Sequence, residues 1–253
     1  MTTPIPEVNL WSALRALTPA RIGLARSGAS LATGPLLDFR LAHARARDAV
    51  RAGLDEPRLA GELAAFGLPV LRVGTPVRDL HQYLMRPDLG RRLTPEAQTE
   101  LAGHAGQHDM VFVIAAGLSA HAVTRHVVPL LAATLPGLGA EGWRIAPLVI
   151  VRHGRVAVGD AVAQALRARA VAILIGERPG LSAPDSLGAY LTWGPGPHTT
   201  DAERNCVSNI RPDGIAPADA AFRLCHLLRS MRSRGLSGVG LKDESESVAI
   251  GTD

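Results

Sequence analysis

The residues best suited to chemistry stand where a buried strand is expected to meet a polar loop. Residues 171–180 read VAILIGERPG, a continuous apolar run followed at once by Gly, two opposite charges, Pro and Gly. Such a run is typical of a parallel strand buried on both faces, and open α/β sheets bind their ligands at the loops that follow these strands. Glu177 can accept hydrogen bonds there and Arg178 can donate them. We therefore expect a ligand site at this edge of the sheet.

Three further loops, at residues 116–119, 152–156 and 194–209, follow runs with a strand-like pattern, and we expect them to converge on the same edge. Polar side chains are concentrated in the four loops, namely Ser119, Arg152, His153, Arg155, Glu177, Arg178, Asp201, Arg204, Asn205, Cys206, Ser208 and Asn209. Such a set, with glycines that let a backbone approach closely, suits a large polar ligand. The alternative is an ordinary polar loop surface, which composition alone does not exclude.

Strands that alternate with helices from about residue 107 onward would position these loops. The expected strands are 110–115, 146–151, 171–175 and a shorter one at 187–193, with a long polar loop after it to about residue 217. The expected helices begin at 120 and cover 160–168 and 217–234. This alternation predicts an α/β protein whose residues 107–253 form a Rossmann-like parallel sheet with right-handed crossovers.

Residues 1–106 have few strand signals and are predicted to form a mostly helical N-terminal region. Helices are expected at 9–17 and 34–50, and a helix should open at Thr94 with Pro95 in its first turn. Residues 68–73 are compatible with one strand, whereas 81–93 contain too many helix breakers for regular structure. The connector between the first two helices is either a surface loop or an arm that contacts another chain.

Familiar catalytic motifs are absent or misplaced. A GxGxxG pattern at 137–142 follows a helix and precedes a strand, the wrong end for a pyrophosphate site. His121 and His126 are five residues apart and do not share a helix face as a metal pair would. Cys206 has no histidine nearby to act as a base, which favours a packing or ligand-contact role over that of a nucleophile. Cys225 falls on the apolar face of the last expected helix.

Composition limits the class of partner. The chain of 253 residues carries a formal net charge of +4, and of its 27 basic residues only Lys242 is a lysine. The arginines are spread along the chain rather than clustered, so nucleic-acid binding ranks last. Two cysteines without a pairing framework indicate a reduced intracellular protein. We expect no signal peptide at the N-terminus and, because no run approaches about 18 apolar residues, no membrane span.

The amino-acid sequences of several segments resemble those of the small (light) subunit of ethanolamine ammonia-lyase. The segments are RHGRVAVGD at 152–160, GERPGLSAPDSLGAYLTW at 176–193, TDAERNCVSNIRPDG at 200–214 and YLMRPDLGRRL at 83–93. LSGVGLKD at 236–243 resembles the family's ending. The match covers nearly the whole chain in the same order, so it is far more specific than any single short motif.

The resemblance implies one subunit of an adenosylcobalamin-dependent lyase that converts ethanolamine to acetaldehyde and ammonia. In that family the large subunit is a TIM barrel that carries the substrate site, and cobalamin lies between it and the small subunit. The cofactor performs the radical chemistry, so this chain should be inactive alone, and residues 1–106 should contact the large subunit. Some members carry a long N-terminal extension associated with microcompartment packaging. We expect a cytoplasmic protein, with a bacterial microcompartment as the alternative location.

The family's cobalamin contacts on the small subunit carry over to Val156, Glu177 and Cys206. A corrin ring is an apolar disc fringed with amide side chains and bearing a nucleotide tail. The resemblance thus implies that Glu177 accepts from amide N–H groups and that Val156 and Cys206 supply small apolar surface. The runner-up interpretation is a self-sufficient Rossmann-like enzyme that uses Glu177 and Arg204 on a small nucleotide or phosphorylated substrate.

Overall fold

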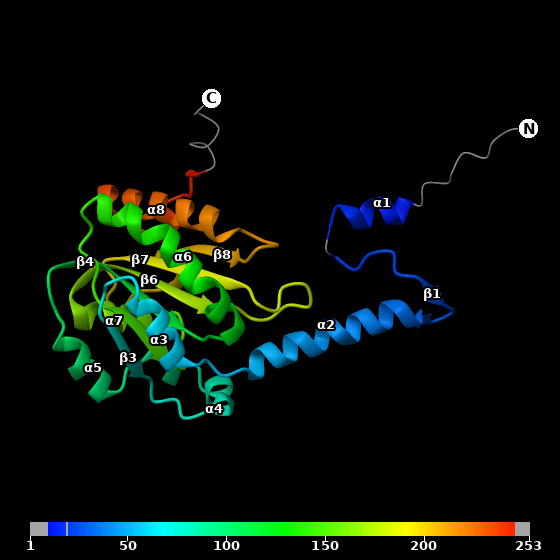
Figure 1. The fold of residues 1–253 in the computed structure, drawn as a ribbon, viewed down its shortest axis with the longest axis horizontal. Coiled ribbons are helices and arrows are strands. Elements are labelled where there is room, and N and C mark those ends of the chain that lie inside the picture. Colours follow the sequence, from blue (N-terminus) through cyan, green and yellow to red (C-terminus); the bar gives the residue numbers. More distant parts are fainter. Residues whose placement is uncertain (1–9, 19, 246–253) are drawn as a thin grey trace, which may run out of the picture.

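A six-stranded mixed sheet with helices on both faces forms the body of the protein (Figure 1). The computed structural model describes residues 10–18 and 20–245, so the expectation about a signal peptide and the predicted helix start at residue 9 lie outside the described residues. The strands are β3 (Val70–Gly74), β4 (His108–Ala115), β5 (Leu148–Arg152), β6 (Ala168–Gly176), β7 (Leu187–Trp193) and β8 (Arg204–Ile210), in the order β3-β5-β4-β6-β7-β8 across the sheet.

The helices connect these strands and extend the chain N-terminally. They are α1 (Leu10–Ala16), α2 (Thr33–Arg51), α3 (Glu56–Ala64), α4 (Leu80–Met85), α5 (Pro95–Ala102), α6 (Ala120–Ala140), α7 (Val158–Leu166) and α8 (Pro217–Arg234). Short 3₁₀ turns, η1 (Leu89–Arg91), η2 (Asp201–Glu203) and η3 (Gly238–Gly240), complete the set. A small hairpin, β1 (Arg26–Ser27) with β2 (Ser30–Leu31), lies between α1 and α2.

The α/β prediction is confirmed, and the strand at 187–193 and the helix at 217–234 have the predicted bounds. Thr94 caps α5, since its hydroxyl accepts from the Ala97 amide at 3.2 Å, with Pro95 in the first turn as expected. Other boundaries differ from the prediction. Residues 81–93 were expected to lack regular structure but contain most of α4, whose cap is Asp79. The helix that begins at residue 120 was expected to end at Pro136 and Gly137, but α6 continues to Ala140.

The expected parallel sheet is wrong for its last two strands. β3, β5, β4 and β6 are parallel, but β7 pairs antiparallel with β6, and β8, which was expected to be loop, pairs antiparallel with β7. The connection at 177–186 is too short to carry a crossover helix, so the chain turns back. The sequence of β8, RNCVSNI, is mostly polar because β8 is an edge strand with one covered face, on which Val207 and Ile210 are buried.

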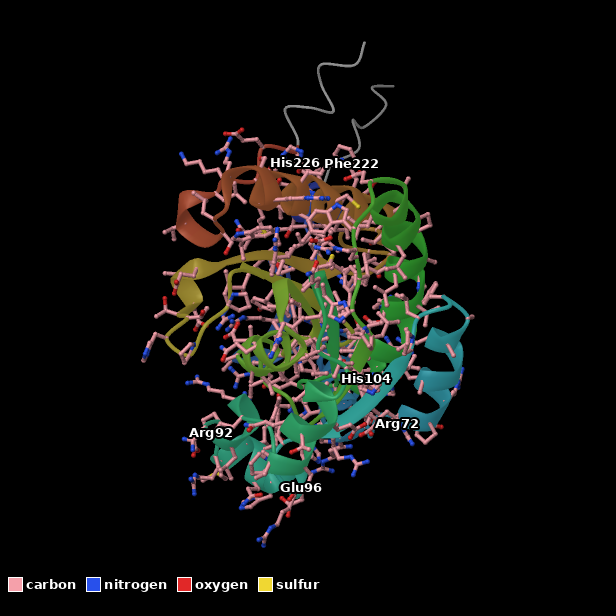
Figure 2. All side chains as sticks on the ribbon, turned by 90° about the vertical axis from the view of Figure 1, so that its left-hand side faces the viewer. Arg72, Arg92, Glu96, His104, Phe222 and His226 are labelled. Atoms are coloured by element: carbon pink, nitrogen blue, oxygen red, sulfur yellow. The ribbon has the colours of Figure 1, made fainter. Side chains whose placement is uncertain are left out.

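Two apolar layers separate the sheet from its helices. One layer, which includes Phe112, Leu174 and Leu224, joins the sheet to α3, α6 and α8, and the other joins it to α5 and α7. Figure 2 shows α8, with Phe222 and His226 projecting outward, on the opposite side of the molecule from Arg92 and Glu96 near α5. α5 and α7 do not extend over β8, and the β8 face turned away from α8 carries the exposed Cys206.

An N-terminal arm, formed by α1, the β1–β2 hairpin and α2, extends away from the body (Figure 1). Of its described residues only Ala49 is buried. Its large apolar side chains are exposed, namely Leu10, Trp11, Leu14, Leu17, Leu31, Leu37, Phe39 and Leu41. Among the described residues, no helix combines the length and apolar character that crossing a membrane requires.

Candidate functional site

A cavity of about 570 Å³ lies between the loop that joins β5 to α7 and the face of β7 and β8 that carries Tyr190 and Cys206. Three parts of the chain line it. They are Pro87 and Arg91 around η1, Arg155 to Ala157 before α7, and Tyr190, Thr199 to Asp201, Arg204 and Cys206 from β7, β8 and their connection. Both charged and apolar side chains line the cavity, which suits a ligand that is itself part apolar and part polar.

The loop between β5 and α7 is held against residues 83–90. The Arg155 amide donates to the Gly90 carbonyl at 2.7 Å, and the buried Tyr83 hydroxyl donates to the Gly154 carbonyl at 3.2 Å. Gly90 cannot be replaced easily, because a Cβ there would stand 2.7 Å from Arg155 Cγ. These contacts fix a tight turn, and Val156 is presented half-buried at the cavity wall.

Cys206 lies on β8 directly opposite Tyr190 of β7, so both side chains point to the same face of the sheet. Although the residue is exposed, partial removal of its thiol from water raises the pKa of Cys206 to about 11, and the nearby charge of Glu177 acts in the same direction. The thiol is therefore protonated at neutral pH. This chemistry agrees with a contact role and not with that of a nucleophile.

Glu177 follows β6 and lies beside the cavity rather than on its lining, near enough for its charge to raise the pKa values of Tyr190 and Cys206, secondary in both cases to desolvation. Its Oε2 accepts from the Ser186 hydroxyl and from the Asn209 amide, the latter at 3.2 Å. Within the described residues Oε1 accepts no hydrogen bond, so one carboxylate oxygen remains available to a ligand.

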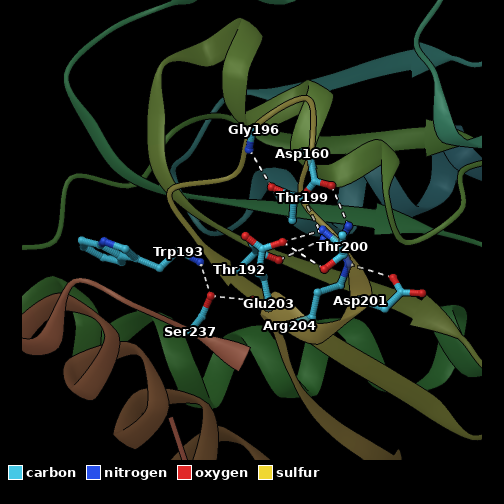
Figure 3. A network of polar contacts seen from close by, with 10 residues as sticks. All are labelled: Asp160, Thr192, Trp193, Gly196, Thr199, Thr200, Asp201, Glu203, Arg204 and Ser237. Atoms are coloured by element: carbon cyan, nitrogen blue, oxygen red, sulfur yellow. Dashed lines mark hydrogen bonds and ion pairs between the residues drawn. The ribbon is translucent and has the colours of Figure 1, made fainter. Parts of the chain in front are cut away.

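Arg204 lines the cavity and is held by a network of polar contacts (Figure 3). Its Nη1 and Nη2 donate to the two carboxylate oxygens of Asp160 at 2.8 and 2.7 Å, Nη1 also donates to Thr192 Oγ1 at 3.0 Å, and Nε donates to Asp201 at 3.2 Å. Four of its five N–H donors are thus used inside the protein, and its side chain is 4% exposed. Arg204 joins α7, β7 and β8, and little of its hydrogen-bonding capacity is left for a substrate.

The expected convergence of four loops is found for three of them. The Leu118 amide donates to the Gly176 carbonyl at 3.0 Å, and residues 116–118 share a second cavity, of about 290 Å³, with Arg152 and His153. The fourth loop differs from the prediction at its start, because the antiparallel β7 carries residue 194 to the opposite edge, where its amide donates to the Arg169 carbonyl at 2.7 Å. Its later residues, Thr199 to Asp201, line the main cavity beside Arg155. β8 then brings Cys206 back toward the site.

Several predicted polar residues have structural partners outside the main cavity. Ser119 caps α6, as expected, through the Ala122 amide at 3.3 Å and is fully buried. Arg152 pairs with Glu56 at 2.9 Å. Tyr190 lines the cavity but was not predicted as a site residue. The sequence feature that could have indicated it is the alternation in GAYLTW, which puts Tyr190 and Thr192 on the face opposite the buried Leu191.

Comparisons with known proteins agree along almost the whole chain. A family model described as "Ethanolamine ammonia-lyase light chain" matches residues 8–242. A protein of Rhodopseudomonas palustris is 53% identical over 246 residues, which cover 97% of this chain and 94% of that one. One of Azotobacter vinelandii is 53% identical, covering 96% and 91%, and one of Xanthomonas campestris pv. campestris is 50% identical, covering 100% and 95%. All three are called "Ethanolamine ammonia-lyase small subunit".

Proposed function

Because this chain belongs to the ethanolamine ammonia-lyase light-chain family, we propose that it is the small subunit of an adenosylcobalamin-dependent lyase that converts ethanolamine to acetaldehyde and ammonia. The observation that supports this most directly is the cavity in which Val156 and Cys206 meet, with Glu177 beside it. These three residues come from separate segments of the sequence, and they are the three positions that the family resemblance implies as cofactor contacts.

A small subunit implies a large partner, and the proposed complex places the substrate on that partner. Two surfaces of this chain support an interface. Among the described residues, no helix covers Cys206 of β8 on the cavity side, and the arm exposes apolar side chains on both of its helices. We propose that the large subunit covers the cavity and that residues 1–106, through the arm, add to the contact. A cytoplasmic location, with microcompartment packaging as the alternative, remains a prediction.

The residues of the cavity fit part of a cobalamin. Val156, Ala157 and the ring of Tyr190 offer apolar surface to a corrin edge, and Glu177 Oε1 is a free acceptor for an amide side chain. The protonated Cys206 thiol adds a small, weakly polar contact. Adenosylcobalamin, when bound, supplies the radical chemistry by cleavage of its cobalt–carbon bond. The role of this chain is to bind and orient the cofactor and to exclude water from it.

The structure gives little support to a self-sufficient enzyme acting on a phosphorylated or nucleotide substrate. That interpretation relied on Glu177 and Arg204, and Arg204 is buried with four donors already used. No separate observation favours it.

Reconstitution tests the proposal. The purified chain, its large partner and their mixture are each titrated with adenosylcobalamin, while absorption spectra and acetaldehyde formation are recorded. We expect ethanolamine turnover and saturable cofactor binding with the mixture only. Full activity of the large partner without this chain would refute the assigned role, as would turnover by this chain alone.

A further inference from the structure

Arg155 is held rigidly at the wall of the cavity. Its Nη2 donates to the Tyr83 carbonyl at 2.6 Å, and its guanidinium carbon stands 4.0 Å from the centre of the Tyr83 ring. The absence of a side chain at Gly90 makes room for Arg155 Cγ, and the Arg155 amide is anchored to the Gly90 carbonyl. A guanidinium placed in this way loses little freedom when it binds a further group.

The charge of Arg155 has no carboxylate partner among the described residues, and its buried Nε has no hydrogen-bond partner there. Arg204, which lines the same cavity, differs in that it pairs with both Asp160 and Asp201. Among the described lining residues the acidic one is Asp201, and its carboxylate already accepts a hydrogen bond from Arg204. Arg91 adds another positive charge to the lining. Glu177 lies beside the cavity, but within the described residues it forms no ion pair with Arg155. A fixed, half-buried guanidinium with an unused donor is suited to bind an anionic group of a ligand.

We infer that Arg155 binds an oxyanion of the ligand in this cavity, and that this oxyanion is the phosphodiester of the cobalamin nucleotide tail. The inference rests on the proposed function. The corrin side chains of cobalamin end in neutral amides, so the phosphodiester is the group of that ligand that carries a negative charge. Arg155 precedes Val156, a proposed cofactor contact, and arginine matches the geometry of phosphate oxygens. The other source of such an oxyanion is a carboxylate of the large subunit.

Binding of two cofactor forms to the wild-type and Arg155→Gln complexes distinguishes the nucleotide tail from a partner carboxylate as the source of the oxyanion. The reconstituted complex with Arg155→Gln is titrated spectroscopically with adenosylcobalamin and with adenosylcobinamide, which lacks the nucleotide tail. Competition by α-ribazole phosphate, the tail without the corrin, provides a second probe. Arg155→Lys retains the charge, and Arg169→Gln changes an exposed arginine at the opposite edge of the sheet.

Loss of a charge-assisted contact should weaken adenosylcobalamin binding by about 10- to 100-fold in Arg155→Gln. Cobinamide binding should change less than about twofold, because each probe isolates one part of the ligand. Competition by α-ribazole phosphate should weaken by the same factor as cobalamin binding, Arg155→Lys should recover part of the affinity, and Arg169→Gln should match the wild type.

Equal losses for cobalamin and cobinamide would overturn the inference, since Arg155 would then support only the loop or the corrin. Unchanged cofactor affinity together with weaker subunit association would assign the oxyanion to the partner chain and also overturn it. Failure of the proposed function looks different, because the wild-type complex would then bind neither cofactor. Circular dichroism and gel filtration of each complex verify folding and assembly.

Discussion

Glu177 keeps its carboxylate in place through two donors and through the absence of a side chain on the neighbouring strand. A Cβ at Gly188 would stand 2.7 Å from Glu177 Oε1 and 3.1 Å from Cε2 of Tyr190. Glycine at 188 therefore leaves the space that Oε1 occupies, while Ser186 and Asn209 hold Oε2. The carboxylate is thus held in one orientation, and within the described residues its Oε1 accepts no hydrogen bond.

Replacing Glu177 with alanine should weaken adenosylcobalamin binding by about 10- to 100-fold, the range expected for loss of a hydrogen bond to a charged group. The reconstituted complex is titrated by absorption spectroscopy. Glu100→Ala, a change at an exposed position of α5, serves as the matched control and should bind as the wild type does. Equal affinity in both variants would remove Glu177 from the cofactor site.

The chemistry of Cys206 gives a pH prediction. With its pKa raised to about 11, the thiol loses its proton only at strongly alkaline pH. Relative to a free cysteine of pKa about 8.5, the thiolate fraction at pH 7.5 falls by about 300-fold, and the greater nucleophilicity of the more basic thiolate offsets about tenfold of this. Iodoacetamide should therefore modify Cys206 about 30-fold more slowly than a model thiol at pH 7.5.

Mass spectrometry of the chain after timed alkylation between pH 7 and 10.5 measures this rate. Because the protonated form persists, the rate should continue to rise up to pH 10.5 rather than level off near pH 9. A plateau at pH 9 would contradict a raised pKa. Cys225, on the buried face of α8, should remain unmodified in the native chain.

At the scale of elements, the site depends on an ion pair that links α7 to the edge strand β8. Asp160 lies in the first turn of α7 and Arg204 is the first residue of β8, and their bidentate ion pair sets where the Val156 loop stands relative to Cys206. Both side chains are buried, so either partner left alone would carry an uncompensated charge. The pair positions the wall of the cavity without lying among the proposed cofactor contacts.

Asp160→Asn should lower the free energy of unfolding by about 3 to 5 kcal/mol, the usual cost of breaking a buried ion pair by removing one partner. Urea unfolding followed by circular dichroism measures the change. Asp219→Asn, at an exposed position in the first turn of α8, is the control and should cost less than about 1 kcal/mol. Similar losses in the two variants would mean that the buried pair contributes no more than a surface helix charge.

The same elements show where sequence reasoning reaches its limit. The buried strands and α8 were predicted well because apolar runs and helical spacing are local signals. β8 was missed because an edge strand covered on one face shares its polar composition with a loop, and the direction of β7 depended on the shortness of residues 177–186. The strand-end pattern indicated Glu177, Cys206 and the loop that ends at Val156, and the family resemblance added their role as cofactor contacts. The roles of Tyr190 and Gly90 depend on contacts between distant segments, which have no local sequence signal.

At the scale of the whole molecule, the arm contributes almost nothing to the core of the body. Ala49 is its one buried side chain among the described residues, while Leu37 and Leu41 of α2 are 56% and 51% exposed. A helix with such a face gains little from packing on its own chain. An apolar, outward-facing arm of this kind is typical of a segment that becomes buried in an assembly.

Replacing both Leu37 and Leu41 with serine should therefore change the thermal unfolding temperature of this chain by less than about 2 °C, as is usual for exposed sites. The same change should weaken association with the large subunit by about tenfold or more, because each leucine buried in the interface contributes about 1.5 to 3 kcal/mol. Analytical ultracentrifugation of the mixture measures the association. Phe222→Ser removes an apolar side chain that is 45% exposed on α8 (Figure 2) and provides the control. If the leucine variant associates normally but self-association of the chain declines, the arm joins copies of this chain instead of the two kinds of subunit.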